Sequence, residues 1–187
     1  PGCTRAELLA GLASGDEIES RLTLPEGGTI WDFARNAERR LGIAADSILV
    51  LARDSGLRQE FGITAPTIEG WLHPDTYLFG AYATPREVVH RFLDARRRRW
   101  SEEWRRRAAA ADLDQVAVLT LASIVEAEAF HDEELVRIAA VYRNRLRIGM
   151  PLQADPTIQY AYLLERGRRE SRLLNRDYRY PSPYNTY

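Results

Sequence analysis

The chain has little of several residue types, and each shortage excludes a class of protein or site. It contains 187 residues with no lysine and one cysteine, so an internal disulfide is impossible. No apolar run reaches the roughly 18 residues that a membrane-spanning helix needs. The formal net charge of -1 lacks the basic excess typical of nucleic-acid binders, so we expect no nucleic-acid partner.

Motifs for metal, phosphate and nucleophile chemistry are also missing from the sequence. His73, His90 and His131 do not have the spacing of metal ligands in a motif such as HExxH. No glycine-rich phosphate loop is present, and no nucleophile-elbow glycines flank Ser123. We therefore expect neither a metal ion nor another cofactor.

The first third of the chain has the pattern of a small α/β unit. Thr29 precedes apolar residues at helical spacing, and Asp32 stands three positions after it, which is the capping-box signature of a helix start. Gly42 is the expected helix end. The expected elements are a strand over 21–24, a helix between Thr29 and Gly42, a short helix over 48–51, and a loop and strand over 56–63.

The remainder of the chain is predicted to be mainly helical. A capping box at residues 84–87 predicts one long amphipathic helix over 85–111, with Trp100 and Trp104 on its buried stripe. Residues 113–129 are apolar on all sides, which is typical of a fully buried helix. Two further helices are expected over 133–148 and from Asp155 to near Gly167, after a connector with strand character over 67–79. The predicted fold class is α+β.

One carboxylate does not fit the apolar helix that contains it. Glu126 lies near the end of that helix, one turn after the small residues Ala122 and Ser123. Burial disfavours the charged form of a carboxylate, and a carboxylic acid that stays protonated near neutral pH can act as a general acid. The alternative interpretation is a structural ion pair with Arg143 or Arg145.

Two other carboxylates are weaker candidates for catalysis. Glu128 lies about 200° around the helix from Glu126, so we expect it to make a structural contact instead. Asp155 precedes a proline, which is the pattern of a helix N-cap. A two-carboxylate glycosidase would need a partner about 5 to 10 Å from its acid, and Asp155 is the candidate for that role.

Five segments form a recognisable set in a fixed order. They are EGWLHPDTY from Glu69 to Tyr77, LASIVEAE from Leu121 to Glu128, VYRNRL from Val141 to Leu146, GMPLQADPT from Gly149 to Thr157, and SPYNTY from Ser182 to Tyr187. This set resembles the motifs of the MltG (YceG-like) family of endolytic murein transglycosylases. The LPEG segment that begins at Leu24 is similar to part of that family's LysM-like subdomain.

The resemblance implies a domain organisation and a location. It predicts a partial LysM-like α/β subdomain over 1–66, followed by a mainly helical, lysozyme-like catalytic domain over 67–187. Because the family begins earlier and continues beyond SPYNTY, we expect this chain to be truncated at both ends, without the C-terminal part of the catalytic domain. The protein would be anchored in the inner (cytoplasmic) membrane by a single N-terminal helix, absent here, with its catalytic region on the periplasmic or extracytoplasmic side.

The resemblance also implies an activity. It is lytic cleavage between N-acetylmuramic acid and N-acetylglucosamine within peptidoglycan strands, which leaves 1,6-anhydro ends and helps to terminate nascent strands or set their length. Glu126 would be the acid and then the base, with no metal or cofactor. Expected partners are peptidoglycan glycan strands and cell-wall synthases. By resemblance, the residues that line or support the cleft are Asn144, Gln153, Asp155, Thr157, Tyr184 and Asn185.

Two alternatives stay open at this point. The chain could be a non-catalytic peptidoglycan-binding or scaffold module, which would bind glycan strands without cutting them. It could also be a lysozyme-like hydrolase that uses water, for which Asp155 is the candidate water-activating carboxylate.

Overall fold

The structure is a computed structural model that describes residues 4–5, 19–170 and 172–187. The chain divides into two compact units, Pro1–Glu102 (the first unit) and Glu103–Tyr187 (the second unit). The sequence analysis placed its domain boundary after residue 66, which is a boundary of a different kind from this division into compact units. The assignment of a LysM-like subdomain and a catalytic domain stays a prediction. The α+β fold class is confirmed by the observed elements.

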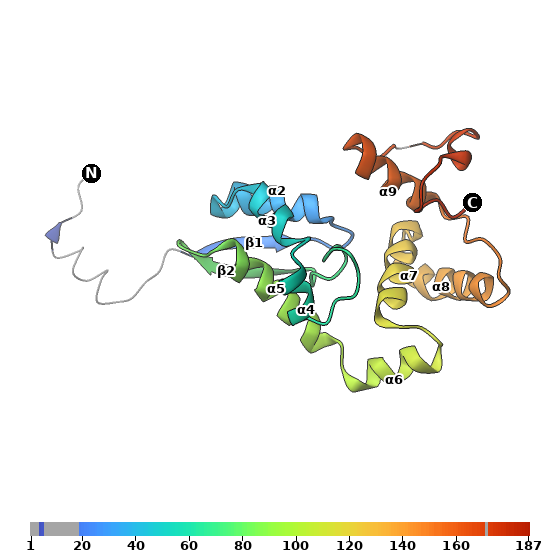
Figure 1. Cartoon of the computed structure of the whole chain (residues 1–187), viewed down its shortest axis with the longest axis horizontal. Coiled ribbons are helices and arrows are strands. Elements are labelled where there is room, and N and C mark those ends of the chain that lie inside the picture. The colour runs from blue at the N-terminus through green and yellow to red at the C-terminus, as the bar shows by residue number, and fades with distance from the viewer. Residues whose placement is uncertain (1–3, 6–18, 171) are drawn as a thin grey trace. The chain divides into compact units, whose positions relative to one another are not determined.

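Residues 19–102 of the first unit form a two-stranded antiparallel sheet and four helices that end by Arg99. Strand β1 (Glu19–Leu24) pairs with β2 (Asp75–Gly80), and Leu22 lies opposite Tyr77. The helices are α2 (Ile30–Leu41), α3 (Ala45–Leu51), α4 (Ser55–Glu60) and α5 (Pro85–Arg99), and α2 packs against both β1 and α3 (Figure 1). The strand predicted over 21–24 and the short helix predicted over 48–51 are therefore confirmed.

An aromatic cluster forms the core of the first unit. The Phe92 ring of α5 lies 4.7 Å from Phe33 of α2 and 4.6 Å from Tyr77 of β2, edge to face in both cases. Phe79 stacks on Phe92 at 6.3 Å. Alternate residues of a strand share one face, so Tyr77 and Phe79 show that α2 and α5 cover the same side of the strand pair. Leu78, on the opposite side, is half exposed.

Local sequence signals begin two of these helices as predicted. The Thr29 amide donates to Asp32 Oδ2 at 3.0 Å, and the Thr84 amide donates to Glu87 Oε2 at 2.8 Å. Each threonine hydroxyl also accepts from the backbone amide of its acidic partner, which completes a capping box. Gly42 ends α2 in the left-handed conformation with φ 69°.

Two predicted elements of the first half were wrong. Residues 56–63 were expected as loop and strand, but α4 begins at Ser55 because the Asp54 carboxylate accepts from the Leu57 amide at 2.7 Å. The single helix over 85–111 is also wrong, because α5 ends at Arg99 and α6 (Glu102–Ala110) begins after a break. Four arginines before the break stabilise a helix C-terminus, and two glutamates after it favour a helix start.

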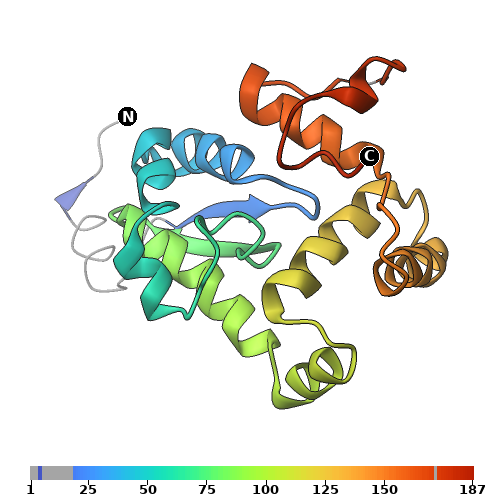
Figure 2. The same ribbon diagram turned by 45° about the vertical axis from the view of Figure 1, so that its right-hand side comes forward.

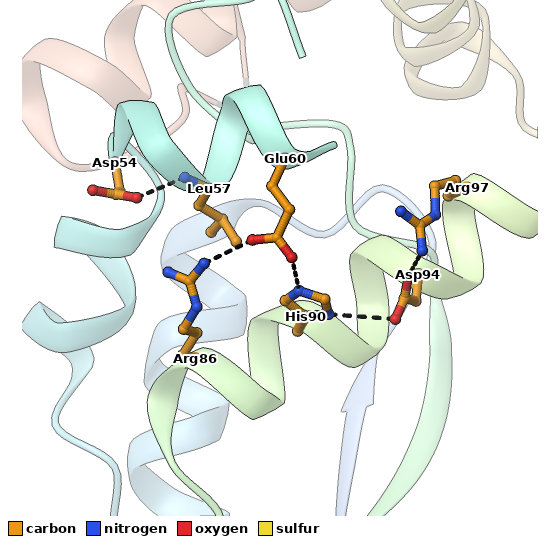
Figure 3. A network of polar contacts seen from close by, with 7 residues as sticks. All are labelled: Asp54, Leu57, Glu60, Arg86, His90, Asp94 and Arg97. Carbon is orange, nitrogen blue, oxygen red and sulfur yellow. Dashed lines mark hydrogen bonds and ion pairs between the residues drawn. The ribbon is translucent and has the colours of Figure 1, made fainter. Parts of the chain in front are cut away.

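A polar network joins α4 to α5 on the surface of the first unit. Figure 3 shows Glu60 of α4 extending toward Arg86 and His90 of α5, at 2.7 and 2.5 Å. The other ring nitrogen of His90 lies 3.3 Å from Asp94, which accepts from Arg97 at 2.6 Å. These contacts join the short helix α4 to the longer α5, in addition to the burial of Leu57 of α4 in the core.

The described residues of the second unit form α6, three longer helices and an irregular tail. Helix α7 (Gln115–Glu128) packs against both α8 (Asp132–Arg147) and α9 (Asp155–Arg166), as Figures 1 and 2 show. A short 3-10 turn, η1 (Asp177–Arg179), lies in the tail. The helices predicted over 133–148 and up to Gly167 are confirmed, with Gly167 left-handed at φ 70°. The core residues that α7 shares with its neighbours are Leu121, Ile124, Val125, Tyr142 and Ala154.

Two burial predictions in this part of the chain were wrong. Trp104 was expected on a buried stripe, but it is 52% exposed on α6, since the helix break removes it from the α5 surface. Helix α7 was expected to be buried all round, yet Ala122 and Ala127 are exposed. Alanine exposes little apolar area, so a helix can be apolar on every side and still leave one face open.

No helix among the described residues is by itself long and apolar enough to span a membrane.

Candidate active site

Helix α7 presents the proposed acid on its open face. Asp114 caps the helix by accepting from the Ala117 amide at 2.7 Å, and Glu126 lies in the last turn. Val125 is buried, but Glu126 is exposed. The predicted burial of Glu126 is therefore wrong, because α7 packs on one side only. The structure shows instead a carboxylate that a large substrate can reach.

Small residues surround this position on the open face, as the sequence predicted. Ala122 and Ser123 lie one turn before Glu126 and are exposed beside it. The Ser123 hydroxyl donates to the Thr120 carbonyl at 2.8 Å, so it turns back onto its own helix. The face around Glu126 is thus free of bulky side chains from its own helix, which suits the approach of a polymer.

Glu128 makes the structural contact that its position on the helix predicted. The Tyr142 hydroxyl of α8 donates to Glu128 Oε1 at 3.0 Å. Burial first, and then the Glu128 charge and hydrogen bond, raise the pKa of Tyr142 to about 12. The phenol therefore stays a neutral donor over the whole physiological range. The Arg145 guanidinium lies over the Tyr142 ring at 5.9 Å and donates to the Leu152 carbonyl.

The last residues of the chain bind the start of α9. The Gln153 amide donates to the Thr186 carbonyl at 2.9 Å, and the Ala154 amide donates to Thr186 Oγ1 at 3.0 Å. The same hydroxyl lies 3.0 Å from the hydroxyl of Thr157, which is buried. The GMPLQADPT and SPYNTY segments are therefore neighbours in space, although about thirty residues separate them in sequence.

Asp155 has a different position from the one predicted. The N-cap of α9 is Ala154, and Asp155 is the first helical residue. Pro156 follows it inside the first turn. Tyr187 donates its hydroxyl to Asp155 Oδ1 at 2.5 Å. Burial and this hydrogen bond raise the pKa of Tyr187. This bond engages one of the two carboxylate oxygens of Asp155 and leaves the other oxygen outside it.

Asn185 and Tyr184 have separate functions in the tail. The Asn185 amide donates to the carbonyls of Tyr178 at 3.1 Å and Tyr180 at 2.9 Å, and its oxygen accepts from the Tyr187 amide at 3.0 Å. All of these partners are backbone groups, so Asn185 shapes the tail. Tyr184 is 45% exposed and packs edge to face on Tyr160 at 5.1 Å, which leaves it accessible to a ligand.

The other two predicted residues lie on exposed positions. Asn144 is exposed on α8, two residues after Tyr142. Gln153 is exposed and has a left-handed φ of 51°, a conformation that costs energy for a residue other than glycine. The structure therefore brings Gln153, Asp155, Thr157, Tyr184 and Asn185 to the α9–tail region, with Asn144 on a separate helix.

Two residues connect elements of the second unit in a way that the sequence did not predict. Thr186 joins the tail to α9, and Tyr142 joins α8 to α7, and each does so through one hydroxyl. Both residues lie inside segments that the sequence analysis recognised, and this was the only sequence signal for them. Their bonding partners are distant in sequence, so the contacts themselves could not be predicted. Among the described residues, no three His, Cys, Asp or Glu side chains gather in an arrangement that could hold a metal ion.

Comparison with known proteins identifies the family of this chain. The model of the YceG-like family matches residues 1–187. The chain belongs to the YceG-like family. A solved structure, a putative yceG-like protein from Listeria monocytogenes, is similar with a TM-score of 0.78 and 25% identity, over 100% of this chain and 66% of that one. The family resemblance found in the sequence is confirmed.

Curated relatives of this YceG-like chain have a common name. The endolytic murein transglycosylase of Bacillus subtilis (strain 168) is 35% identical over 120 residues, which are 64% of this chain and 32% of the relative. The endolytic murein transglycosylase of Streptococcus pneumoniae serotype 2 (strain D39) is 27% identical over 166 residues, 78% of this chain and 30% of the relative. The chain thus spans about a third of the length of these relatives.

Proposed function

We propose that this YceG-like chain is part of an endolytic lytic transglycosylase that cuts peptidoglycan strands between N-acetylmuramic acid and N-acetylglucosamine. The observation that carries the proposal is the family match over residues 1–187, together with relatives named endolytic murein transglycosylase. The motif that contains Glu126 lies within this match.

Glu126 supplies the proton chemistry of the proposed reaction. Its carboxylic acid protonates the glycosidic oxygen as the bond to the muramic C1 breaks. The resulting carboxylate then accepts the proton of the muramic C6 hydroxyl, whose oxygen bonds to C1 and closes a 1,6-anhydro ring. One carboxylate returns to its starting state, and no water is consumed. An exposed position on α7 suits this function, because the scissile bond belongs to a long polymer.

The alternatives make different use of the same residues. A hydrolase needs a second carboxylate to activate water, and the candidate for that function is Asp155, which accepts a hydrogen bond from the Tyr187 hydroxyl. A scaffold module needs no acid at position 126. Neither alternative accounts for the name shared by the curated relatives as well as the lytic reaction does.

The experiment that tests the proposal compares the full-length protein with Glu126→Gln. Glutamine keeps the size and the acceptor oxygen of the side chain but cannot transfer a proton. We expect release of anhydro-terminated glycans by the parent, none by the variant, and equal binding of peptidoglycan by both. Release at the parental rate by Glu126→Gln would remove Glu126 as the acid. Binding without release by both proteins would favour the scaffold.

The proposal also includes location and partners. We propose a single N-terminal membrane anchor, an extracytoplasmic catalytic region, and association with cell-wall synthases, which would place strand cleavage next to strand synthesis. Membrane fractionation and protease accessibility of the full-length protein test the first two. A crosslinking pull-down without any synthase would remove the third and leave the chemistry untouched.

A further inference from the structure

The turn of α7 that contains Glu126 is electrostatically unfavourable. Glu126 and Glu128 both lie at the C-terminal end of the helix, where the helix dipole repels negative charge, and the last turn has no basic residue. The last carbonyls of a helix also lack partners within the helix. A turn of this kind frays unless a group outside the helix holds it.

Tyr142 binds this turn from the neighbouring helix α8. It is 5% exposed on α8 and belongs to the same core as Val125, so its ring has a fixed place. Its hydroxyl donates to Glu128 Oε1 at 3.0 Å. Glu126 is thus bracketed by a buried residue immediately before it and a hydrogen-bonded residue two positions after it, while its own side chain is exposed.

A second tyrosine–carboxylate bond lies nearby. Tyr187 donates to Asp155 at the start of α9. Burial and the hydrogen-bonded carboxylate are the main causes of the raised pKa of each tyrosine. The Asp155 charge adds to the raised pKa of Tyr142, and the Glu128 charge adds to the raised pKa of Tyr187. The carboxylate of each pair therefore acts electrostatically on the tyrosine of the other pair. One bond joins α7 to α8, and the other joins the tail to α9.

We propose that Tyr142 and Glu128 are positioning residues for Glu126, and that their hydrogen bond holds the last turn of α7 so that the Glu126 carboxylate keeps one orientation toward the glycan. The inference rests on the proposed function. The bond acts on the rate of the chemical step and leaves glycan binding unchanged, because a misplacement of about 1 Å at a reacting group can cost about 100-fold in rate.

The test measures kcat and KM of the full-length protein on soluble, uncrosslinked glycan strands. Tyr142→Phe keeps the buried ring and removes only the donor, and Glu128→Ala removes the acceptor. Both are expected to lower kcat about 10- to 100-fold with KM unchanged. Glu128→Gln keeps an acceptor oxygen for the phenol and should retain most of the activity. Tyr82→Phe, at a residue 95% exposed in the first unit, is the matched control with parental kinetics.

Several outcomes would overturn the inference. Parental kcat in both Tyr142→Phe and Glu128→Ala would show that the bond does not position the acid. A loss that disappears after correction for the folded fraction, measured by circular dichroism, would show a purely structural bond. Glu128→Gln as slow as Glu128→Ala would exclude the hydrogen bond as the cause. Parental activity of Glu126→Gln, in contrast, would contradict the proposed function itself, whatever the Tyr142 variant does.

Discussion

The two compact units depend on ionisable groups at opposite ends of the pH scale. In the first unit, hydrogen bonds lower the pKa of three carboxyls, those of Asp32, Glu60 and Glu87. In the second unit, the groups with a raised pKa are the phenols of Tyr142, Tyr162, Tyr180 and Tyr187. The pKa is also raised at Tyr77 and lowered by burial at His73 and Arg96 in the first unit, and it is lowered at Asp177 in the second unit.

The difference reflects how each unit connects its segments. In the first unit, carboxylates mostly serve local functions, such as the capping boxes at Thr29 and Thr84, while a large aromatic cluster around Phe92 supplies the core. In the second unit, tyrosine hydroxyls join segments that are distant in sequence, as Tyr142 and Tyr187 do. The first unit therefore relies more on apolar burial, and the second relies more on polar bonds between helices.

Phe92→Ala should produce the largest difference in stability between the two units. Phe92 is fully buried, and loss of a buried phenylalanine costs about 3 to 5 kcal/mol. Hydrogen exchange should show lost protection in β1, β2 and α2 but preserved protection in α7 and α9. Phe130→Ala, at a residue 90% exposed, should change protection nowhere. Equal loss of protection in both units would mean that they unfold as one and that the comparison fails.

Thr186→Val should weaken the second unit by a smaller amount. It keeps the shape of the side chain but removes the hydroxyl that the Ala154 amide and Thr157 contact, which costs about 1 to 3 kcal/mol. Faster exchange of the Gln153 and Ala154 amides is the expected readout. Thr186→Ser restores the hydroxyl and should restore protection. Unchanged exchange in the valine variant would show that the tail is held by other contacts.

Alkaline pH should weaken the second unit first. The pKa of Tyr142 is raised from 10.0 to about 12, so its stabilising contribution is present below pH 10 and is lost as the pH rises through about 12. Tyr142→Phe lacks this contribution and should be less stable at pH 9, with a flatter decline between pH 10 and 12. Circular dichroism at increasing pH gives the comparison. Parallel curves for parent and variant would contradict it.

Acid pH should lower the stability of the first unit, and the contribution of the single residue Glu87 should be the smallest of these effects. The Thr84 amide and then its hydroxyl lower the pKa of Glu87 below 4.5, so this contribution is present above that pH and is lost as the pH falls through the lower, folded-state value. Glu87→Gln should therefore flatten the acid limb of the first unit slightly. Chemical denaturation of the parent and of Glu87→Gln at pH 5 and pH 3 measures this effect. If both proteins lose the same free energy of unfolding between the two pH values, Glu87 makes no such contribution.

The sequence predicted elements whose signals are local and missed features that depend on distant partners. The capping boxes at Thr29 and Thr84 and the glycine ends at Gly42 and Gly167 lie within a few residues of the helices that they limit, so they could be found. The helix break at Trp100 also had a local signal, four arginines followed by two glutamates, but the apolar stripe seemed to continue through it.

The candidate site rests on its motifs and not on the physical environment that the sequence analysis expected. Glu126 was identified through an argument from burial that the structure contradicts, because apolar composition does not say which face of α7 is covered. The contacts of Thr186 with α9 and of Tyr142 with Glu128 depend on tertiary packing, which has no periodicity in the sequence. The resemblance pointed to five segments, and the structure shows that GMPLQADPT and SPYNTY meet in space.

The most direct test of the central claim is the reaction run in water enriched in oxygen-18, with mass spectrometry of the released glycan ends. Attack by the muramic C6 hydroxyl consumes no water, so the account predicts anhydro ends that are lighter by one water molecule than hydrolysis products and that contain no oxygen-18. Glu126→Gln should release neither product. Reducing ends that contain oxygen-18 would show that water is the nucleophile and would contradict lytic cleavage by Glu126.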